Sequence, residues 1–316
     1  MAMSGGGNRA SYQAGAVYAL VHNLDPSEVA WDIVSGVSGG AMNAGRMSTF
    51  EVGDELAMAE SLKEFWHTLE REEIWVLWDG GLYEGVFNQS GVFNTAPFDQ
   101  TFKDIFEESS VKRRMVVSSV DSKTGLYHPL HEDVAPEDLS TIVLASGAVP
   151  AVFPSKHYND YVLMDGGTVW NTNFVDPIQR CYELVDEPSQ IVVDIAICQH
   201  MALNESTSTG NTIDNLLRYR EINQYYRTLD YLYDFAEANP EVNYRYLFTP
   251  SVDIPGGVQM LDFGHEATDS IFEIGVKDGE AMLGLGEQVG MNRLREWKKS
   301  ADLQIKFENF RDYLYA

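Results

Sequence analysis

A serine in a glycine-rich turn is the first candidate for chemistry in this sequence. Residues 36–40 are GVSGG, fit the pattern G-x-S-x-G, and follow the apolar stretch 30–34. In that pattern the serine occupies a strained strand-to-helix turn with its hydroxyl exposed, and small neighbours allow strand and helix to approach closely. We therefore predict that Ser38 is a nucleophile. The small neighbours are Gly36, Gly39 and Gly40.

A second glycine turn lies at another expected strand-to-helix junction, where residues 5–9 are GGGNR. Bare backbone amides can close on a small anion, such as the negative oxygen of a tetrahedral intermediate. A competing interpretation exists, because residues 5–10 also fit a dinucleotide fingerprint, with Asp25 loosely placed for a ribose. That interpretation leaves the serine-bearing turn unexplained.

A nucleophilic serine needs a base. The sequence has seven histidines, and none of them is embedded in a glycine turn at the end of a strand. Asp165 is so placed, because Asp165-Gly166-Gly167 follows the apolar stretch 161–164. A carboxylate within hydrogen-bond reach can accept the serine proton directly. We predict Asp165 as the base.

The elements that must position these residues alternate between strand and helix. Strand, glycine turn and helix recur twice near the start, which is typical of parallel βαβ units. No repeat, low-complexity tract or linker divides the 316 residues, so we predict one domain over 1–316, with the motifs within 4–167 and a helical part from about 205 to 316. The expected helices cover 10–23, 40–47, 54–69, 136–145, 211–238 and 266–298. The expected strands are a short one ending near residue 4, then 30–34, 114–120, 126–130, 161–164, 190–198 and 244–248; residues 75–93 form an aromatic excursion without a clean period.

Composition excludes several classes of protein. Acidic residues number 48 and basic residues 22, a net charge of −26 that disfavours nucleic acid and anionic lipid as partners. No apolar run approaches the roughly 20 residues that cross a bilayer, so we expect a soluble protein. The first residues lack the features of a signal peptide, which leaves a cytoplasmic location or, if an upstream signal was removed, a secretory one. We expect Cys181 and Cys198 to be two buried thiols rather than a disulfide, and no metal site.

Taken together, the ordered motifs resemble the patatin-like phospholipase family. The resemblance covers about residues 1–180, and the C-terminal third matches only in general character. The matching segments are SGGGNR at 4–9, GVSGG at 36–40, GVFNTAPF at 91–98, VVSSVDSKTG at 116–125, LASGAVPAVFP at 144–154 and DGG at 165–167.

The resemblance implies a three-layer α/β/α fold with a mainly parallel sheet, and a Ser–Asp dyad of Ser38 and Asp165 that works without histidine or cofactor. It also implies an oxyanion hole and a supporting loop. The hole comprises the amides of Gly5, Gly6 and Gly7; the supporting positions are Asn8, Arg9, Gly36, Gly39, Gly40, Gly166 and Gly167. Asn8 and Ala10 depart from the family's more usual residues, which affects the loop shape and the choice of individual oxyanion donors.

The implied reaction is hydrolysis of a fatty-acyl ester, with a phospholipid or lysophospholipid as the partner and transient contact with a membrane or micelle. The excursion at 75–93 is a candidate wall for an acyl pocket or a lipid-resting surface. Two alternatives stay open: a general carboxylesterase or acyltransferase with the same dyad, and a non-catalytic lipid-binding module. The oligomeric state does not follow from the sequence.

Overall fold

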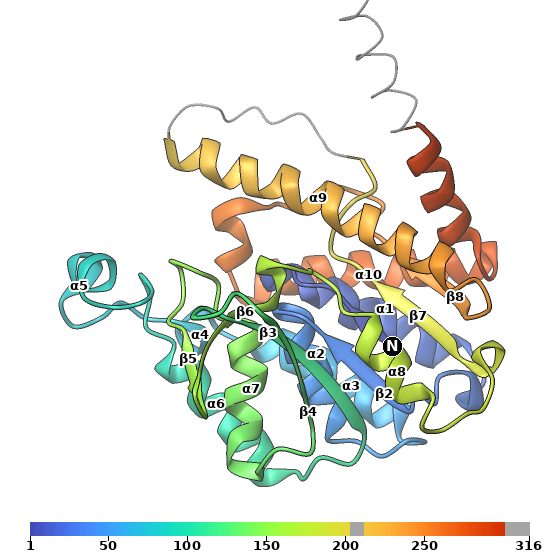
Figure 1. The fold of residues 1–316 in the computed structure, drawn as a ribbon, viewed down its shortest axis with the longest axis horizontal. Coiled ribbons are helices and arrows are strands. Elements are labelled where there is room, and N and C mark those ends of the chain that lie inside the picture. The colour runs from blue at the N-terminus through green and yellow to red at the C-terminus, as the bar shows by residue number, and fades with distance from the viewer. Residues whose placement is uncertain (203–211, 301–316) are drawn as a thin grey trace, which may run out of the picture.

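The computed structural model describes residues 1–202 and 212–300, and a mixed, mainly parallel sheet lies at its centre (Figure 1). The strand order is β5-β6-β3-β2-β1-β7-β8, with β4 beside β3. Neighbouring strands among β3, β2, β1, β7 and β8 are parallel, whereas the pairs that involve β4, β5 and β6 are antiparallel. The strands are β1 Ala2–Met3, β2 Ile33–Gly36, β3 Arg114–Asp121, β4 Tyr127–His131, β5 Lys156–Tyr158, β6 Tyr161–Asp165, β7 Val192–Ala196 and β8 Asn243–Phe248.

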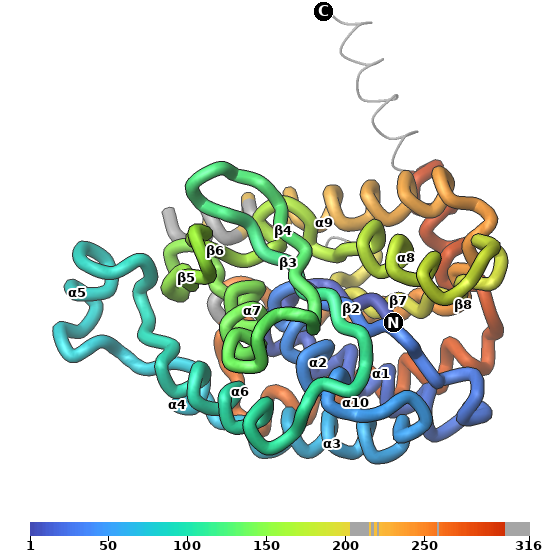
Figure 2. The backbone as a smooth tube through the Cα atoms, turned by 60° about the horizontal axis from the view of Figure 1, so that its bottom comes forward, coloured from blue at the N-terminus to red at the C-terminus, as the bar shows by residue number. Residues whose placement is uncertain are grey.

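Helices cover both faces of this sheet (Figure 2). The α-helices are α1 Ala10–Asn23, α2 Gly39–Ser48, α3 Glu55–Thr68, α4 Arg71–Ile74, α5 Gly81–Phe87, α6 Ala96–Glu108, α7 Leu139–Ser146, α8 Val175–Cys181, α9 Thr212–Ala238 and α10 His265–Leu285. Short 3₁₀ turns are η1 Gly7–Arg9, η2 Pro26–Glu28, η3 Pro136–Asp138, η4 Gly166–Thr168, η5 Pro188–Gln190 and η6 Gly257–Leu261. In Figure 2, α8 and α9 lie on one side of the strands, and α1, α2, α3 and α10 on the other.

The two faces bury separate hydrophobic clusters. Side chains alternate along a strand, so the two residues of β1 point to opposite faces. Met3 joins the cluster of α1, α2, α3, α7 and α10, whereas Ala2 joins the cluster of α8 and α9. The predicted three-layer α/β/α fold with a mainly parallel sheet is thus confirmed.

Strands β2 and β6 run end to end along one edge of β3. Val117 pairs with β2 and also with β4, so β2 and β4 occupy opposite edges of β3. Val120 pairs with β4 and with β6, so β6 is also opposite to β4. Because a strand has only two edges, β2 and β6 share one. They run in opposite directions, and their carboxyl ends meet beside Ser118.

Several local expectations need correction. The second strand is Ile33–Gly36 rather than 30–34. The last predicted helix is interrupted at Gly286, because its φ of 96° is not helical. A separate helix covers 289–300. Helices α4, α5, α6 and α8 and strand β5 were not predicted. The other predicted helices and strands are present with shifted ends, and part of the predicted C-terminal helical region lies outside the described residues.

Within the described residues, no helix combines the length and the apolar character that crossing a membrane requires. Both cysteines are free thiols; Cys198 is buried and Cys181 is half-buried. The prediction of one domain over 1–316 stays a prediction.

Candidate active site

Ser38 sits on a strained turn between β2 and α2. Its φ of 54° and ψ of −123° are unusual for a residue with a side chain, and such strain is concentrated at functional sites. A Cβ on Gly36 would lie 2.0 Å from the carbonyl oxygen of Gly40, so position 36 tolerates no side chain. At this position a side chain is excluded because the end of β2 contacts the start of α2.

A hydroxyl from α7 holds the backbone of this turn. The N–H of Ser38 donates to Ser146 Oγ at 2.9 Å, and Ser146 Oγ donates to the carbonyl oxygen of Ser118 at 2.6 Å. Ser118 lies on β3 at the point where the ends of β2 and β6 meet. The buried Ser146 side chain therefore links the Ser38 turn to β3 at this point.

Asp165, the last residue of β6, is 2% exposed, and Ser38 is 6% exposed. The backbone N–H of Asp165 donates to the carbonyl oxygen of Ala148 at 2.9 Å. Its Oδ1 accepts the N–H of Gly167 at 2.6 Å, which fixes the carboxylate against its own turn.

The side chain of Asn171 lies close to both candidate catalytic residues. A Cβ on Gly5 would lie 3.0 Å from Ser38 Cβ and 2.5 Å from Asn171 Oδ1. A Cβ on Gly167 would lie 2.8 Å from the same Asn171 oxygen and 2.9 Å from Asp165 Oδ1. The side chains of Ser38 and Asp165 therefore both lie near the Asn171 amide oxygen.

Asn171 also fastens the first glycine loop. The N–H of Gly5 donates to the backbone oxygen of Asn171 at 2.9 Å, and Asn171 Nδ2 donates to the oxygen of Gly5 at 3.1 Å. Gln224 of α9 donates to Asn171 Oδ1 at 2.7 Å. The Gly5 amide is thus engaged, while the amides of Gly6 and Gly7 have no acceptor among the described residues.

The supporting residues Asn8 and Arg9 anchor the loop in different ways. Asn8 Nδ2 donates to the backbone oxygens of Gln259 and Asp262 at 3.0 and 2.6 Å, which ties the loop to η6. Arg9 is buried and donates from Nε to the oxygen of Gly6 at 3.4 Å. Nearby, burial raises the pKa of the Cys198 thiol to about 11, so this sulfur is protonated at neutral pH.

Ser38 and Asp165 line one cavity of about 380 Å³, within the usual size range of small-molecule sites. One part of its wall is polar, and the rest is mainly apolar. The polar side chains are Arg9, Ser38, Asp165, Asn171, Glu221 and Gln224; the larger apolar ones are Met42, Val92, Phe93, Val149, Val152, Phe153, Met260, Leu261 and Phe263.

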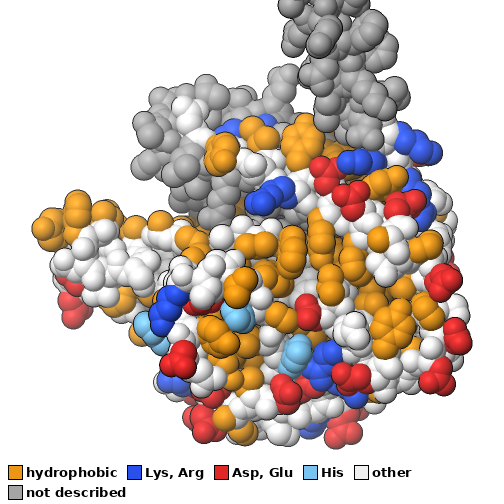
Figure 3. Space-filling model, in the orientation of Figure 1, with side chains coloured by type: hydrophobic (Ala, Val, Ile, Leu, Met, Phe, Trp, Pro, Cys, Tyr) orange, Lys and Arg blue, Asp and Glu red, His pale blue; other side chains and the backbone are white. Residues whose placement is uncertain are grey.

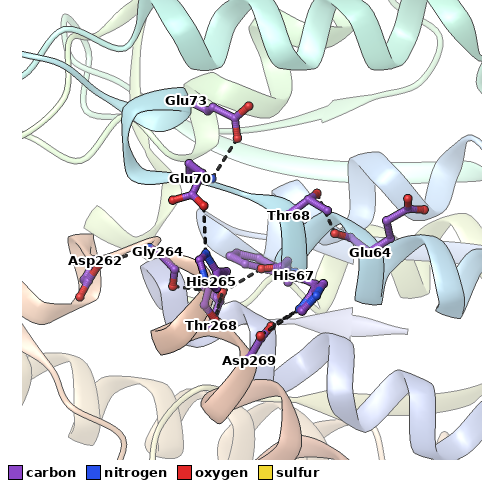
Figure 4. A network of polar contacts seen from close by, with 11 residues as sticks. Glu64, His67, Thr68, Glu70, Glu73, Asp262, Gly264, His265, Thr268 and Asp269 are labelled. Atoms are coloured by element: carbon purple, nitrogen blue, oxygen red, sulfur yellow. Dashed lines mark hydrogen bonds and ion pairs between the residues drawn. The ribbon is translucent and has the colours of Figure 1, made fainter.

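No histidine lines this cavity, although all seven lie in the described part of the chain. Two of them form contacts with carboxylates outside the cavity. His67 contacts Asp269 and His265 contacts Glu70, each at 2.9 Å, and these pairs join the α3–α4 junction to the start of α10 (Figure 4). Phe263, two residues before the start of α10, lines the cavity.

Sequence reasoning missed Asn171, Ser146 and Gln224. Asn171 follows the DGG turn by four residues, and Ser146 belongs to the LASG segment, so both lay beside motifs already singled out. Gln224 lies on α9, which carries no comparable signal. No cluster of three or more His, Cys, Asp or Glu side chains suited to a metal ion occurs within residues 1–202 and 212–300.

The model of the patatin-like phospholipase family matches residues 1–178, more than half of the sequence. The chain belongs to the patatin-like phospholipase family. Membership in this family supports lipid acyl hydrolase activity in general. The matched span contains both glycine turns and the DGG turn that meet at the cavity.

Among solved structures, the patatin-like chain is similar to the crystal structure of VipD from Legionella pneumophila. The two share 11% sequence identity with a TM-score of 0.41, and the match covers 90% of this chain and 66% of the VipD chain. None of the curated proteins compared matches the sequence.

Proposed function

We propose that this protein is a serine lipid acyl hydrolase that cleaves fatty-acyl ester bonds of phospholipids or lysophospholipids. Ser38 is the nucleophile and Asp165 its base. The observation that carries the proposal is the single cavity that holds both side chains beside a mainly apolar wall. An ester carbonyl fits the polar part, and the fatty-acyl chain fits the apolar part.

The first step of this reaction forms an acyl-enzyme. Ser38 Oγ attacks the ester carbonyl carbon while Asp165 accepts the hydroxyl proton. The carbonyl oxygen becomes negative in the tetrahedral intermediate. Gly6 and Gly7 are the donors we assign to it, because the Gly5 amide already bonds Asn171. The N-terminus of α2, directly after Ser38, adds a favourable dipole.

The second half of the reaction returns the enzyme to its starting state. The protonated Asp165 gives its proton to the leaving alcohol oxygen as the carbon–oxygen bond breaks. Water then attacks the acyl-enzyme while Asp165 accepts a proton from that water. Asp165 passes this proton to Ser38 Oγ as the bond to the acyl group breaks and the fatty acid departs. One carboxyl group thus serves as base and acid in turn.

A fluorophosphonate probe tests the nucleophile in one gel. Wild type should be labelled, Ser38→Ala should not, and the exposed control Ser110→Ala should be labelled like wild type. A folded wild type that resists the probe would favour a non-catalytic binding module.

Substrate class needs a second measurement. The rates on a short soluble ester and on a long-chain phospholipid are compared below and above the lipid's micelle concentration. A lipid acyl hydrolase should favour the long-chain phospholipid. A preference for the short ester at all concentrations would instead indicate a general carboxylesterase.

A further inference from the structure

An arm formed by residues 77–93 projects from the body of the protein. Two backbone hydrogen bonds of 2.9 Å between Val76 and Asn94 close its base. The arm contains α5, which extends outward beyond α4 and β5 in both Figure 1 and Figure 2. It is therefore a defined protrusion with a narrow attachment.

The arm exposes more large apolar side chains than any other described stretch of its length. Tyr83 and Phe87 are each 70% exposed, and their rings pack 4.9 Å apart. Hydrophobic side chains gather at its tip in Figure 3. The exposed set is Leu77, Leu82, Tyr83, Val86 and Phe87. Such a concentration of exposed apolar side chains on a protein surface marks an interaction site.

The charges of this region select the kind of partner. Residues 72–102 contain no lysine or arginine, and the arm itself carries only Asp79 and Glu84. The side-chain amides of Asn88 and Gln89 donate to the Glu84 carboxylate at 2.7 Å. These polar groups of the arm therefore bond each other. Without cations on the arm, and with a net charge of −26, an anionic surface would repel it. A neutral, zwitterionic lipid surface would not.

The arm is continuous with the wall of the cavity that holds Ser38. Its returning segment bonds the chain ahead of β5, because the N–H groups of Val92 and Phe93 donate to the oxygens of Ala151 and Val152 at 3.0 Å. All four residues line the Ser38 cavity. Phe93 also lines an apolar groove of about 480 Å³ that reaches Leu82 on the arm. Phe93 thus borders both the groove on the arm and the cavity that holds Ser38.

We propose that the arm docks on a zwitterionic phospholipid surface by inserting Leu82, Tyr83 and Phe87, and so brings the cavity to aggregated lipid. The delivery of lipid to Ser38 rests on the proposed function, whereas the docking does not. Amphipathic interfacial segments bind in proportion to the apolar area they bury, and aromatic residues suit the boundary between headgroups and acyl chains.

Flotation with phosphatidylcholine vesicles tests the docking. The arm variant is Leu82→Ser, Tyr83→Ser and Phe87→Ser; the matched control is Leu56→Ser, Leu126→Ser and Leu285→Ser, which are exposed apolar residues outside the arm. Wild type, the control and the inactive Ser38→Ala protein should float with the vesicles. The arm variant should bind at least about tenfold more weakly. Circular dichroism and unfolding confirm that it is folded.

Hydrolysis separates this inference from the proposed function. On a short soluble ester the arm variant should keep a rate within about twofold of wild type, while its rate on vesicle phospholipid falls at least about tenfold. A wild type that floats through the arm but hydrolyses no ester would overturn the proposed function and leave the docking supported. Equal vesicle binding by wild type and arm variant would overturn the docking, as would an arm-dependent dimer in sedimentation without vesicle binding.

Discussion

Ser38 and Asp165 lie at the carboxyl ends of two strands that run toward each other along the same edge of β3. Gly36 of β2 pairs with Val117, and Asp165 of β6 pairs with Ser119, so a single β3 residue separates the two pairings. Ser38 follows its strand by two residues and turns back into α2. The serine turn follows the parallel strand β2. Because β6 runs antiparallel to β3, its carboxyl end brings Asp165 to the same place.

Replacing Asp165 by asparagine should abolish most ester hydrolysis without unfolding the protein. The amide retains an acceptor for the Gly167 N–H, but it cannot take the proton of Ser38. We expect kcat to fall by about 10²–10⁴-fold. The measurement is the steady-state rate on a soluble ester, with circular dichroism as the check on folding.

Histidine variants supply the control for this prediction. Single replacements of His22, His67, His128, His131, His157, His200 and His265 should leave the rate within about threefold of wild type, since none of them lines the cavity. Full activity in folded Asp165→Asn, or its loss in one histidine variant, would refute the assignment of the base.

We expect Asn171 to act as a positioning residue for the first glycine loop. Its side chain bonds Gly5 and Gln224 and lies near both Ser38 and Asp165. Asn171→Ala should loosen the glycine loop and lower kcat by about 10–100-fold, with KM changed less than about twofold, because small misplacements of reacting groups are costly. The matched control is Asn223→Ala, which removes an exposed amide next to Gln224 on α9. A rise in KM alone would contradict a positioning role.

The sequence predicted the parts of the site that are locally encoded. A glycine at position 36 follows from the contact of the end of β2 with the start of α2, which is a short-range constraint. Position 165 was predicted because the DGG turn directly follows its strand. These features depend on neighbours within a few residues along the chain.

The missed parts depend on contacts between distant segments. The hydrogen bond from the Gly5 amide to the backbone oxygen of Asn171, 166 positions away, could not be read from the sequence. The shared edge of β3 depends on the pairing of β6, which no local pattern specifies. Helix α6 is different, because its buried Phe98, Phe102 and Ile105 have helical spacing and Pro97 lies at its start, so the signal was present in the sequence.

Gly36→Ala should destabilise the fold as well as disturb the serine turn. The added Cβ would lie 2.0 Å from a backbone oxygen, which cannot rotate away as a side chain can. We expect a loss of about 3 kcal/mol in the free energy of unfolding, measured by urea denaturation. The control is Gly284→Ala in α10, where a Cβ meets no atom within 4 Å and should add about 0.5–1 kcal/mol. Equal stability of both variants would show that the turn is not tightly packed.

The pair of His265 and Glu70 should give the protein a stability component that depends on pH. The hydrogen bond and charge of Glu70 raise the pKa of His265 above its ordinary 6.5 in the folded protein (Figure 4). This contribution is fully present below about pH 6.5, the pKa in the unfolded chain, and it is lost as the pH rises through the raised value. Glu70→Gln should shift the NMR titration of His265 downward and reduce the difference in unfolding free energy between about pH 5.5 and 8.5. Glu64→Gln, on the same side of the molecule but without contact to His265, should change neither quantity; an unchanged titration in Glu70→Gln would show that the pair does not form in solution.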